Sequence, residues 1–426
     1  MDEKLAIDGG PKAKTTPNFP MFPGGMEIGE EEKKQVLEVL DRKYLFRYYG
    51  PENFPSKVKE FETKFKEKIG AKYALATSSC TGALLCALVA CGVGPGDEVI
   101  VPGYTFFATA AVVVGAKAIP VISEVDETLT IDPEDVERKI TKSTKAVIVV
   151  HMRGVPADMD KLLDIAKRYN LKVIEDVAQA AGGTYKSRYL GTFGDCGCFS
   201  FQFHKIITAG EGGMVVTNDP RLYDRCMGYH DTAACWRPDR FADERYPGEL
   251  FCGSNFRMSE LAGAVLLAQI DKLDNLLEKM RKNQKRIIEG IKDNKKIKLR
   301  PVNDPNGDTG VCLMFYLDDK NRVPYFVEAL RAEGVDATGA YNSGIPDWHI
   351  YAHWKHLLEK KTPTQEGCPW TCPYHKGQDV KYSADMNPKT LDYLSRAVHI
   401  NIPPQMTLED CDMIAKAINK VASILD

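Results

Sequence analysis

Residues that could perform group-transfer chemistry follow the predicted strands in the first half of the chain. The segment FSFQFHKIITAGEGG, residues 199–213, has one lysine, Lys205, between an aromatic strand and a glycine-rich turn. Asp176 ends the apolar strand LKVIED, and Thr81 begins a helix after LATSSC. Ligands of open α/β sheets bind beyond the carboxyl ends of the strands. We therefore expect one site that collects these strand-end residues: Thr81, Gly82, Phe106, Asp176, Gln179, Ser200 and Lys205.

The chemical types in this set fit pyridoxal phosphate. A lysine amine can form a Schiff base with the cofactor aldehyde, and an acid can keep the pyridine nitrogen protonated so that the ring accepts electrons. The start of a helix binds a phosphate dianion, and a flat aromatic side chain can stack on the ring. Each residue alone has an ordinary structural explanation, such as a surface lysine or a helix cap. The prediction therefore depends on the whole set.

Alternating strands and helices are expected to position this set. Helical periodicity, as in MDKLLDIAKRYN (159–170), separates short and strongly apolar strands. This alternation predicts an α/β protein with a mostly parallel sheet that is covered on both faces. The predicted strands are residues 72–77, 98–103, 145–152 and 171–177, followed by CGCFSFQ and GMVVTN.

We expect four parts along the chain. Residues 1–30 form an N-terminal arm, and residues 31–255 form the large domain that binds pyridoxal phosphate. A connecting helix at 256–294 leads to a small C-terminal α+β domain at 295–426. The small domain holds an irregular insertion at about 341–380, rich in Pro, Trp, His and Cys.

The insertion contains histidines at a spacing that could bind a metal. His349, His353 and His356 fall at i, i+4 and i+7, the spacing of one helix face. Cys368, Cys372 and His375 follow nearby. Pyridoxal phosphate chemistry needs no metal, so we expect an aromatic packing face and no metal site.

Composition and charge exclude several classes of protein. The 426 residues are 44% hydrophobic, which is enough to form a sizeable core. A formal net charge of −3, with no long run of one sign, argues against nucleic-acid binding. The longest apolar stretch, from Ala108, is interrupted by Gly115, Lys117 and Pro120, and the N-terminus has no signal-peptide pattern. We therefore expect a cytoplasmic protein without membrane segments, in which most of the 12 cysteines are small buried hydrophobic residues.

Five motifs together resemble the DegT/DnrJ/EryC1/StrS family of sugar aminotransferases, which are pyridoxal phosphate enzymes of fold type I. The resemblance runs through most of residues 1–290 and becomes weaker afterwards. It implies the aspartate-aminotransferase architecture, with a mostly parallel seven-stranded sheet sandwiched by helices and a smaller C-terminal α+β domain. The motifs are SSCTGAL (78–84), VPGYTFFAT (101–109), VIEDVAQAAGG (173–183), FSFQFHKIITAGEGG (199–213) and GSNFRMSEL (253–261).

The resemblance also implies a role for each matching residue. Lys205 matches the Schiff-base lysine, and Asp176 matches the partner of the pyridine nitrogen. Gln179 matches the contact near the phenolic oxygen, and Phe106 matches the residue that stacks on the ring. The residues that match phosphate contacts are Thr81, Gly82, Ser200 and Asn255, of which Asn255 acts from the neighbouring subunit. This last role implies a homodimer with shared active sites.

The implied activity is transfer of an amino group from glutamate or glutamine to the ketone of a keto-sugar. Some members of the family carry histidine at the lysine position and act as dehydratases, and His204 would fill that role if the register shifted by one residue. Counting from Ser200–Phe201 to the GEGG turn favours Lys205, and hence the aminotransferase. A pyridoxal-phosphate-binding regulator without turnover is the alternative from another class.

The acceptor is predicted from weaker signals. The segments FRYY (46–49), NDPNGD (303–308) and DWHIYAHWKH (347–356) look similar to members that form an 8-amino-octulosonate sugar of lipopolysaccharide. The acceptor would then be an acidic keto-sugar without a nucleotide, while nucleotide-linked keto-sugars and keto-inositols remain alternatives. Arginines could meet a carboxylate of such an acceptor. The candidate substrate residues are Arg47, Tyr48, Arg153, Arg257 and His349.

Overall fold

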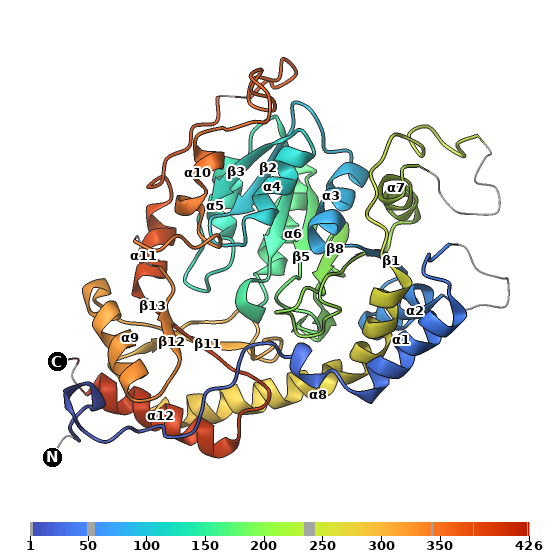
Figure 1. Ribbon diagram of the computed structural model, residues 1–426. Helices are drawn as coiled ribbons and strands as arrows, with labels where there is room; N and C mark the ends of the chain where they lie inside the picture. Colours follow the sequence, from blue (N-terminus) through green and yellow to red (C-terminus); the bar gives the residue numbers. More distant parts are fainter. Residues whose placement is uncertain are drawn as a thin grey trace.

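A seven-stranded sheet forms the centre of the larger part of the protein (Figure 1). The computed structural model describes residues 3–48, 56–233, 243–341, 344–377, 379–423 and 425. The strand order is β1-β9-β8-β5-β4-β2-β3, and β9 alone is antiparallel to its two neighbours. The predicted mostly parallel seven-stranded sheet is therefore confirmed. The strands are β1 (Tyr73–Thr77), β2 (Glu98–Pro102), β3 (Ile119–Ser123), β4 (Thr144–Val150), β5 (Lys172–Asp176), β8 (Cys196–Ser200) and β9 (Gly213–Thr217).

Both faces of this sheet are covered. Successive side chains of a strand point to opposite faces, and all five residues of β2, β8 and β9 are buried. Polar residues start several of the covering helices, since Ser79, Asp158 and Asp219 accept hydrogen bonds from N–H groups in the first turn. The helices of this part are α1 (Glu30–Arg42), α2 (Lys57–Ile69), α3 (Cys80–Ala90), α4 (Ala108–Gly115), α5 (Pro133–Lys139), α6 (Met159–Tyr169) and α7 (Pro220–His230).

A four-stranded antiparallel sheet forms a second, smaller part near the C-terminus. Its order is β10-β11-β13-β12, and it has its own apolar core with α9 (Val323–Ala332) and α12 (Leu408–Ala422). The N-terminal segment packs there too, because the buried Glu333 carboxylate accepts hydrogen bonds from the N–H groups of Ala6 and Ala13. Figure 1 shows both ends of the chain beside α12. The strands are β10 (Lys298–Leu299), β11 (Cys312–Tyr316), β12 (Ala337–Gly339) and β13 (Ala397–Asn401).

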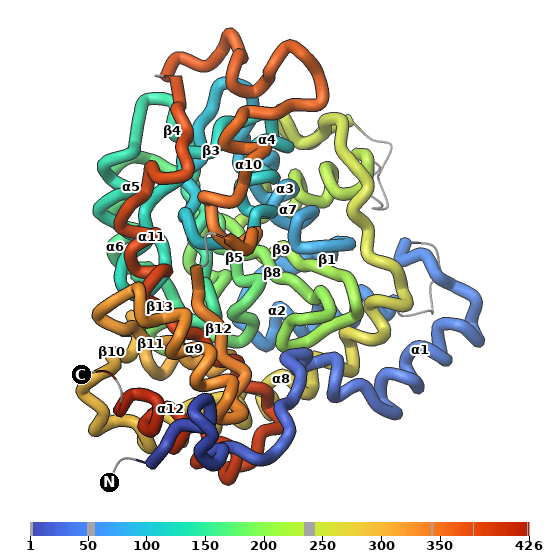
Figure 2. The backbone as a smooth tube through the Cα atoms, turned by 60° about the vertical axis from the view of Figure 1, so that its left-hand side comes forward, coloured from blue at the N-terminus to red at the C-terminus, as the bar shows by residue number. Residues whose placement is uncertain are grey.

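One long helix connects the two parts. α8 (Glu260–Ile291) contains 32 residues, and Ser259 caps its first turn. It runs along the bottom of the molecule in Figures 1 and 2, from α1 and α2 at one end to α12 at the other. α8 therefore joins the two parts of the protein, and its buried side chains contribute to the apolar cores of both.

The segment after β12 packs on the large sheet rather than on the small one. Its backbone bonds the loop that follows β2, where Thr105 N–H donates to His349 O and Phe107 N–H donates to Trp348 O. The helix expected across the three histidines is interrupted at Trp354, between η5 (Tyr351–His353) and α10 (Lys355–Leu358). The expectation that these histidines share one helix face is therefore wrong. α11 (Pro388–Arg396) then leads into β13.

Two further findings bear on the predictions from composition. Within the described residues, no helix combines the length and the apolar character needed to cross a membrane. The described cysteines are all unpaired, and most of them are buried, while Cys252 and Cys368 are exposed.

Candidate active site

A cavity of about 620 Å³ lies at the carboxyl ends of β4, β5 and β8, beside the first turns of α3 and α4. The small sheet closes it on another side with Cys312 from β11 and His399 and Asn401 from β13. Of the seven strand-end residues expected to meet, six line this cavity: Thr81, Phe106, Asp176, Gln179, Ser200 and Lys205. Two of the five candidate substrate residues, Arg153 and His349, line it as well.

Lys205 follows β8 in a turn that is held by its backbone N–H, which donates to Gln202 O at 2.9 Å. Within the described residues its ammonium group makes no hydrogen bond or ion pair. Burial lowers the pKa of Lys205, while the nearby Cys80 and Asp176 act in the opposite direction. A lowered pKa increases the fraction of neutral amine, the form that attacks a carbonyl carbon. His204, one residue earlier, is exposed and packs its ring against Phe22 at 5.0 Å between ring centroids.

Asp176 is the last residue of β5 and is 5% exposed. Its two carboxylate oxygens are bound separately, Oδ1 by the N–H of Ala178 at 3.1 Å and Oδ2 by the hydroxyl of Thr109 at 3.0 Å. Burial raises the pKa of Asp176, and these two hydrogen bonds oppose the rise. A buried carboxylate at this position can therefore bind a protonated nitrogen that enters the cavity.

The start of α3 offers a phosphate site to the cavity. Ser79 caps the helix and accepts a hydrogen bond from the N–H of Gly82 at 3.1 Å, while Thr81 is exposed toward the cavity. Gly82 does not line the cavity, and a Cβ atom at this position would lie 2.9 Å from the ring of Phe256. The structure thus explains this glycine by close packing. An anion at this helix start would meet the free N–H groups before Gly82.

Phe106 and His349 form an aromatic wall at the cavity. Their ring centroids are 5.4 Å apart, and Nδ1 of His349 lies 2.8 Å from Oδ1 of Asp347. Burial lowers the pKa of His349, although the bond to Asp347 opposes this effect. His349 is therefore neutral over more of the pH range than an exposed histidine.

Arg153 and Gln179 are linked to each other on the cavity wall. Oε1 of Gln179 accepts a hydrogen bond from the N–H of Arg153 at 3.0 Å, and Nε of Arg153 donates to the Tyr104 hydroxyl at 3.2 Å. Arg153 has a left-handed backbone conformation, with φ of 55°. This uncommon conformation turns the chain after β4 so that the guanidinium lies against the cavity.

Besides Gly82, four predicted residues do not line the cavity of their own chain. Arg47 is buried and forms an ion pair with Glu62 at 2.6 Å, and the Tyr48 hydroxyl lies 2.9 Å from Nε2 of His230. Arg257 pairs with Asp231. Asn255 bonds within the same segment, where its Oδ1 accepts from the N–H of Arg257 at 3.2 Å. Any of these four residues could therefore contribute to a cavity only if it reached into that of a second subunit.

The structure also adds cavity residues that the sequence motifs did not indicate. Thr109 is the second residue of α4 and acts through Asp176, while His399 and Asn401 come from β13. No local pattern links β13 to Lys205, which is nearly 200 residues earlier in the sequence. The alternation along β13 is the only signal that could have placed His399 and Asn401 on one face.

The histidines of the insertion contact backbone groups and aromatic rings. His353 Nδ1 accepts a hydrogen bond from Asp347 N–H at 2.7 Å, and the ring of His356 packs on Phe107 with 4.2 Å between centroids. Across the described parts of the chain, no group of three or more His, Cys, Asp or Glu is arranged to hold a metal ion. The aromatic packing expected for this segment is seen at His356, which packs on Phe107, and at His353, which stacks on Tyr341.

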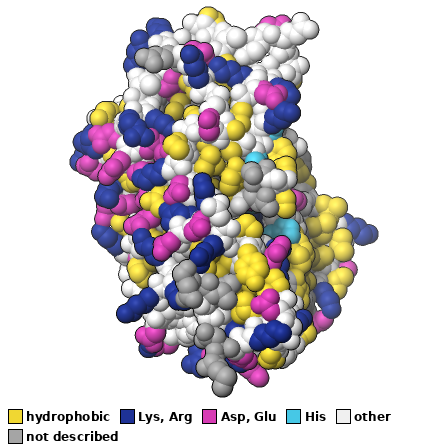
Figure 3. Space-filling model, turned by 90° about the vertical axis from the view of Figure 1, so that its left-hand side faces the viewer, with side chains coloured by type: hydrophobic (Ala, Val, Ile, Leu, Met, Phe, Trp, Pro, Cys, Tyr) yellow, Lys and Arg dark blue, Asp and Glu magenta, His cyan; other side chains and the backbone are white. Residues whose placement is uncertain are grey.

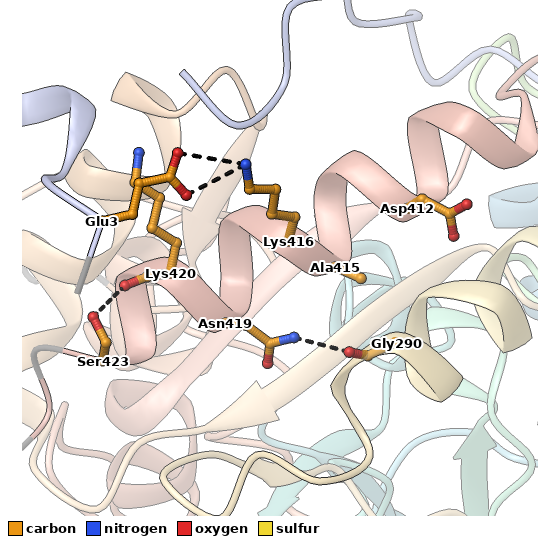
Figure 4. A pocket seen from close by; sticks show the side chains of 8 residues that line it. All are labelled: Glu3, Gly290, Asp412, Ala415, Lys416, Asn419, Lys420 and Ser423. Atoms are coloured by element: carbon orange, nitrogen blue, oxygen red, sulfur yellow. Dashed lines mark hydrogen bonds and ion pairs between the residues drawn. The ribbon is translucent and has the colours of Figure 1, made fainter. Parts of the chain in front are cut away.

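A second concavity lies far along the chain from the first, between the N-terminal segment and α12 (Figure 4). Lys416 pairs with Glu3 at 3.3 Å, and Asn419 donates to Gly290 O at 2.8 Å. Lys420 forms an ion pair with Glu333 at 2.8 Å. Lys416 and Lys420 in this second concavity are therefore already paired with acids. The concavity is a packing groove between the two ends of the chain.

Comparison with known proteins gives a consistent result. A sequence model described as the DegT/DnrJ/EryC1/StrS aminotransferase family matches residues 26–371. The GDP-perosamine synthase of Escherichia coli O157:H7 is 40% identical over 252 residues, which are 59% of this chain and 66% of that protein, slightly less than two thirds of its length. The L-glutamine:2-deoxy-scyllo-inosose aminotransferase of Micromonospora echinospora is 39% identical over 292 residues, 67% of this chain and 68% of that protein. The solved structure of 3-amino-5-hydroxybenzoic acid synthase superposes with a TM-score of 0.79 and 26% identity, covering 96% of this chain and all of that one.

Proposed function

Because the chain belongs to the DegT/DnrJ/EryC1/StrS aminotransferase family, we propose that it transfers an amino group from glutamate or glutamine to the ketone of a keto-sugar or keto-cyclitol. Family and fold agree with the predictions made from the sequence, and dependence on pyridoxal phosphate is a property of this family. The names of two relatives, a GDP-perosamine synthase and a scyllo-inosose aminotransferase, support these two acceptor classes. The observation that carries the proposal is that Lys205, Asp176 and Phe106 line one cavity.

The cavity residues fit pyridoxal phosphate. The volume of about 620 Å³ accommodates the ring and its phosphate together with a small substrate. Asp176 would accept a hydrogen bond from the ring nitrogen, Phe106 would cover one ring face, and Thr81 and Ser200 would bind the phosphate. When bound, the cofactor supplies a reactive carbonyl carbon and a ring that withdraws electrons from the substrate.

The residues of the chain would then perform the proton transfers. Lys205, with its lowered pKa, would bind the cofactor covalently in the resting protein and would hold and return a proton after the donor has displaced it. Asp176 would stay ionised beside a protonated ring nitrogen, because the opposite charge compensates for the burial that raises its pKa. The small sheet and the insertion would exclude water from the reacting atoms.

We also propose that the active protein is a cytoplasmic homodimer with shared sites. Asn255 does not line the cavity of its own chain, so its predicted phosphate contact requires a second subunit. Large aromatic side chains remain exposed near the cavity, with Phe106 at 51%, Phe203 at 40% and Trp348 at 49%. Figure 3 shows hydrophobic side chains gathered on one face of the molecule, beside exposed histidines. Apolar surface of this kind is typical of a protein interface.

Two measurements test the proposed function. Borohydride treatment of the holoprotein, followed by peptide mass analysis, should leave the cofactor attached to Lys205 and to no other lysine. A panel of keto-sugars and keto-cyclitols, offered with glutamate or glutamine, should release the matching 2-oxo acid. Loss of label from Lys205 would contradict the cofactor assignment. Absence of the 2-oxo acid with every acceptor and donor would contradict the aminotransferase and favour the regulator.

A further inference from the structure

Among the residues that the structure describes, Arg153 lines the cavity and has no acid partner. Its Nε donates to Tyr104, and in the described part of the chain its two other nitrogens bind no carboxylate. Asp347 is near enough for its charge to act on Arg153, yet its Oδ1 is bound by the N–H and the Nδ1 of His349, at 2.9 Å and 2.8 Å. A guanidinium that is partly removed from water favours an anion in contact with it.

The other arginines predicted to meet a carboxylate are already paired. Arg47 binds Glu62 and also donates to Ala76 O at 3.0 Å. Arg257 binds Asp231. Arg153 therefore differs from both, because it lies on the cavity wall and its charge is paired with no carboxylate of the described residues.

A buried histidine of β13, His399, lines the same cavity. His399 is 7% exposed, and its Nε2 has no hydrogen-bond partner within the described residues, while its Nδ1 lies 3.3 Å from the Thr338 hydroxyl. Asn401 stands two residues further along β13 and lines the cavity on the same face of the strand. An unpartnered polar atom at this depth costs free energy unless a ligand binds it.

We propose that Arg153, with His399 beside it, forms a subsite for a carboxylate group of the substrate. This inference rests on the proposed aminotransferase function, and it adds that at least one of the two substrates is held through a carboxylate at Arg153. The planar guanidinium can donate two parallel hydrogen bonds to a carboxylate, and Nε2 of His399 can donate a third in the tautomer that leaves Nδ1 to accept from Thr338. The carboxylate can come from the amino donor or from an acidic keto-sugar, because both substrates of a ping-pong reaction use one cavity in turn.

The binding of glutarate, a dicarboxylate that has neither amine nor ketone, tests the subsite without turnover. Calorimetry on the holoprotein should show that the Kd for glutarate rises about 10- to 100-fold in Arg153→Met, because this variant loses a charge-assisted hydrogen bond. The Kd should rise less in Arg153→Lys, which keeps the positive charge but loses the planar guanidinium that can bind a carboxylate with two hydrogen bonds. Arg286→Met, which removes only a surface ion pair with Asp412, is the control and should leave the Kd unchanged. The absorbance of bound cofactor reports that each variant keeps its site. An unchanged Kd in Arg153→Met holoprotein would overturn the proposal.

A second comparison needs no variant. Glutaramide has the same length as glutarate without its charge, so wild-type holoprotein should bind glutarate at least about tenfold more tightly. Equal binding of the two compounds would overturn the subsite even if Arg153→Met lost its cofactor.

Single half-reactions identify which substrate carries the carboxylate. If it belongs to the donor, Arg153→Met raises KM for release of 2-oxoglutarate from glutamate. If it belongs to the acceptor, the variant preloaded with pyridoxamine phosphate loses reaction with acidic keto-sugars and keeps reaction with neutral ones. Either loss supports the subsite, and no change in either half-reaction would refute it. Failure of the proposed function is separate, because a wild-type protein without any transamination could still bind glutarate through Arg153.

Discussion

Oε1 of Gln179 accepts a hydrogen bond from the backbone N–H of Arg153 at 3.0 Å. This bond joins the turn after β5 to the left-handed residue that follows β4. It occupies the oxygen of the amide and leaves the NH₂ group as the part of Gln179 that can donate to a ligand. The predicted contact with the phenolic oxygen of the cofactor requires such a donor.

Replacing this donor by an acid should weaken cofactor binding. Gln179→Glu can still accept from Arg153 N–H, but it would set a carboxylate against a negatively charged oxygen. We expect the Kd for pyridoxal phosphate to rise by about tenfold or more, the effect of losing one hydrogen bond to a charged group. Absorbance titration of the apoprotein measures this value. Gln179→Met removes the donor without adding charge and should show a smaller loss, and equal affinities for all three proteins would contradict the role of the amide.

Thr109 should affect the pH below which the protein loses affinity for the cofactor. Its hydroxyl hydrogen bonds Asp176, and its oxygen accepts from Thr105 at 2.7 Å. Thr109→Val keeps the shape but removes the bond that stabilises the carboxylate, so the pKa of Asp176, already raised by burial, should rise further. Cofactor affinity should then begin to fall at a higher pH than in the wild type. Thr105→Val leaves the bond to Asp176 in place and should shift this pH less; coincident profiles for the wild type and both variants would refute the argument.

The large sheet and its ligand edge could be predicted because their signals are local. Buried strands such as β4, with AVIVV at 146–150, read as continuous apolar runs, and Asp176 stands at the end of the next strand. The break at Trp354 was not predictable from spacing, because the loop after β2 bonds the segment before it and overrides its helical periodicity. Spacing describes one chain segment, whereas this contact joins residues about 240 positions apart.

Site roles that depend on ion pairs or strand pairs between distant parts of the chain could not be predicted from the sequence either. Arg47, Arg153 and Arg257 look equivalent as arginines in a substrate motif, and only the positions of Glu62 and Asp231 separate the paired two from the third. Similarly, His399 enters the cavity because β13 pairs with β11 in a register that sets it opposite Met314. Neither relationship has a signature within a short window of sequence.

Stability in acid should depend on His230. This residue is fully buried, with Nδ1 at 2.6 Å from Met227 O and Nε2 at 2.9 Å from the Tyr48 hydroxyl, and burial lowers its pKa to about 3 from 6.5. The unfolded chain therefore binds one more proton than the folded chain between pH 6.5 and about 3. The contribution of His230 is fully present above pH 6.5 and is lost as the pH falls through this window.

Urea unfolding of His230→Gln across this range tests the prediction. The glutamine does not titrate, so the stability difference between wild type and variant should shrink as the pH falls from 7 to 4, by up to about 1.4 kcal/mol for each pH unit below 6.5. Subtracting the free energy of unfolding of the variant from that of the wild type at each pH removes the contribution of the other titratable groups. A difference that stays constant over this range would show that His230 does not titrate with the predicted shift.

Mixed dimers test whether Asn255 serves the neighbouring cavity. Lys205→Met and Asn255→Ala should each abolish or strongly reduce transamination, since one removes the amine and the other a phosphate contact. If Asn255 acts across the interface, a hybrid of the two variants contains one site with both native residues and one site with neither. Random exchange makes half of the dimers hybrids, so an equal mixture should recover about a quarter of wild-type activity. If Asn255 served its own chain, every site of the hybrid would carry one defect, and mixing would restore nothing.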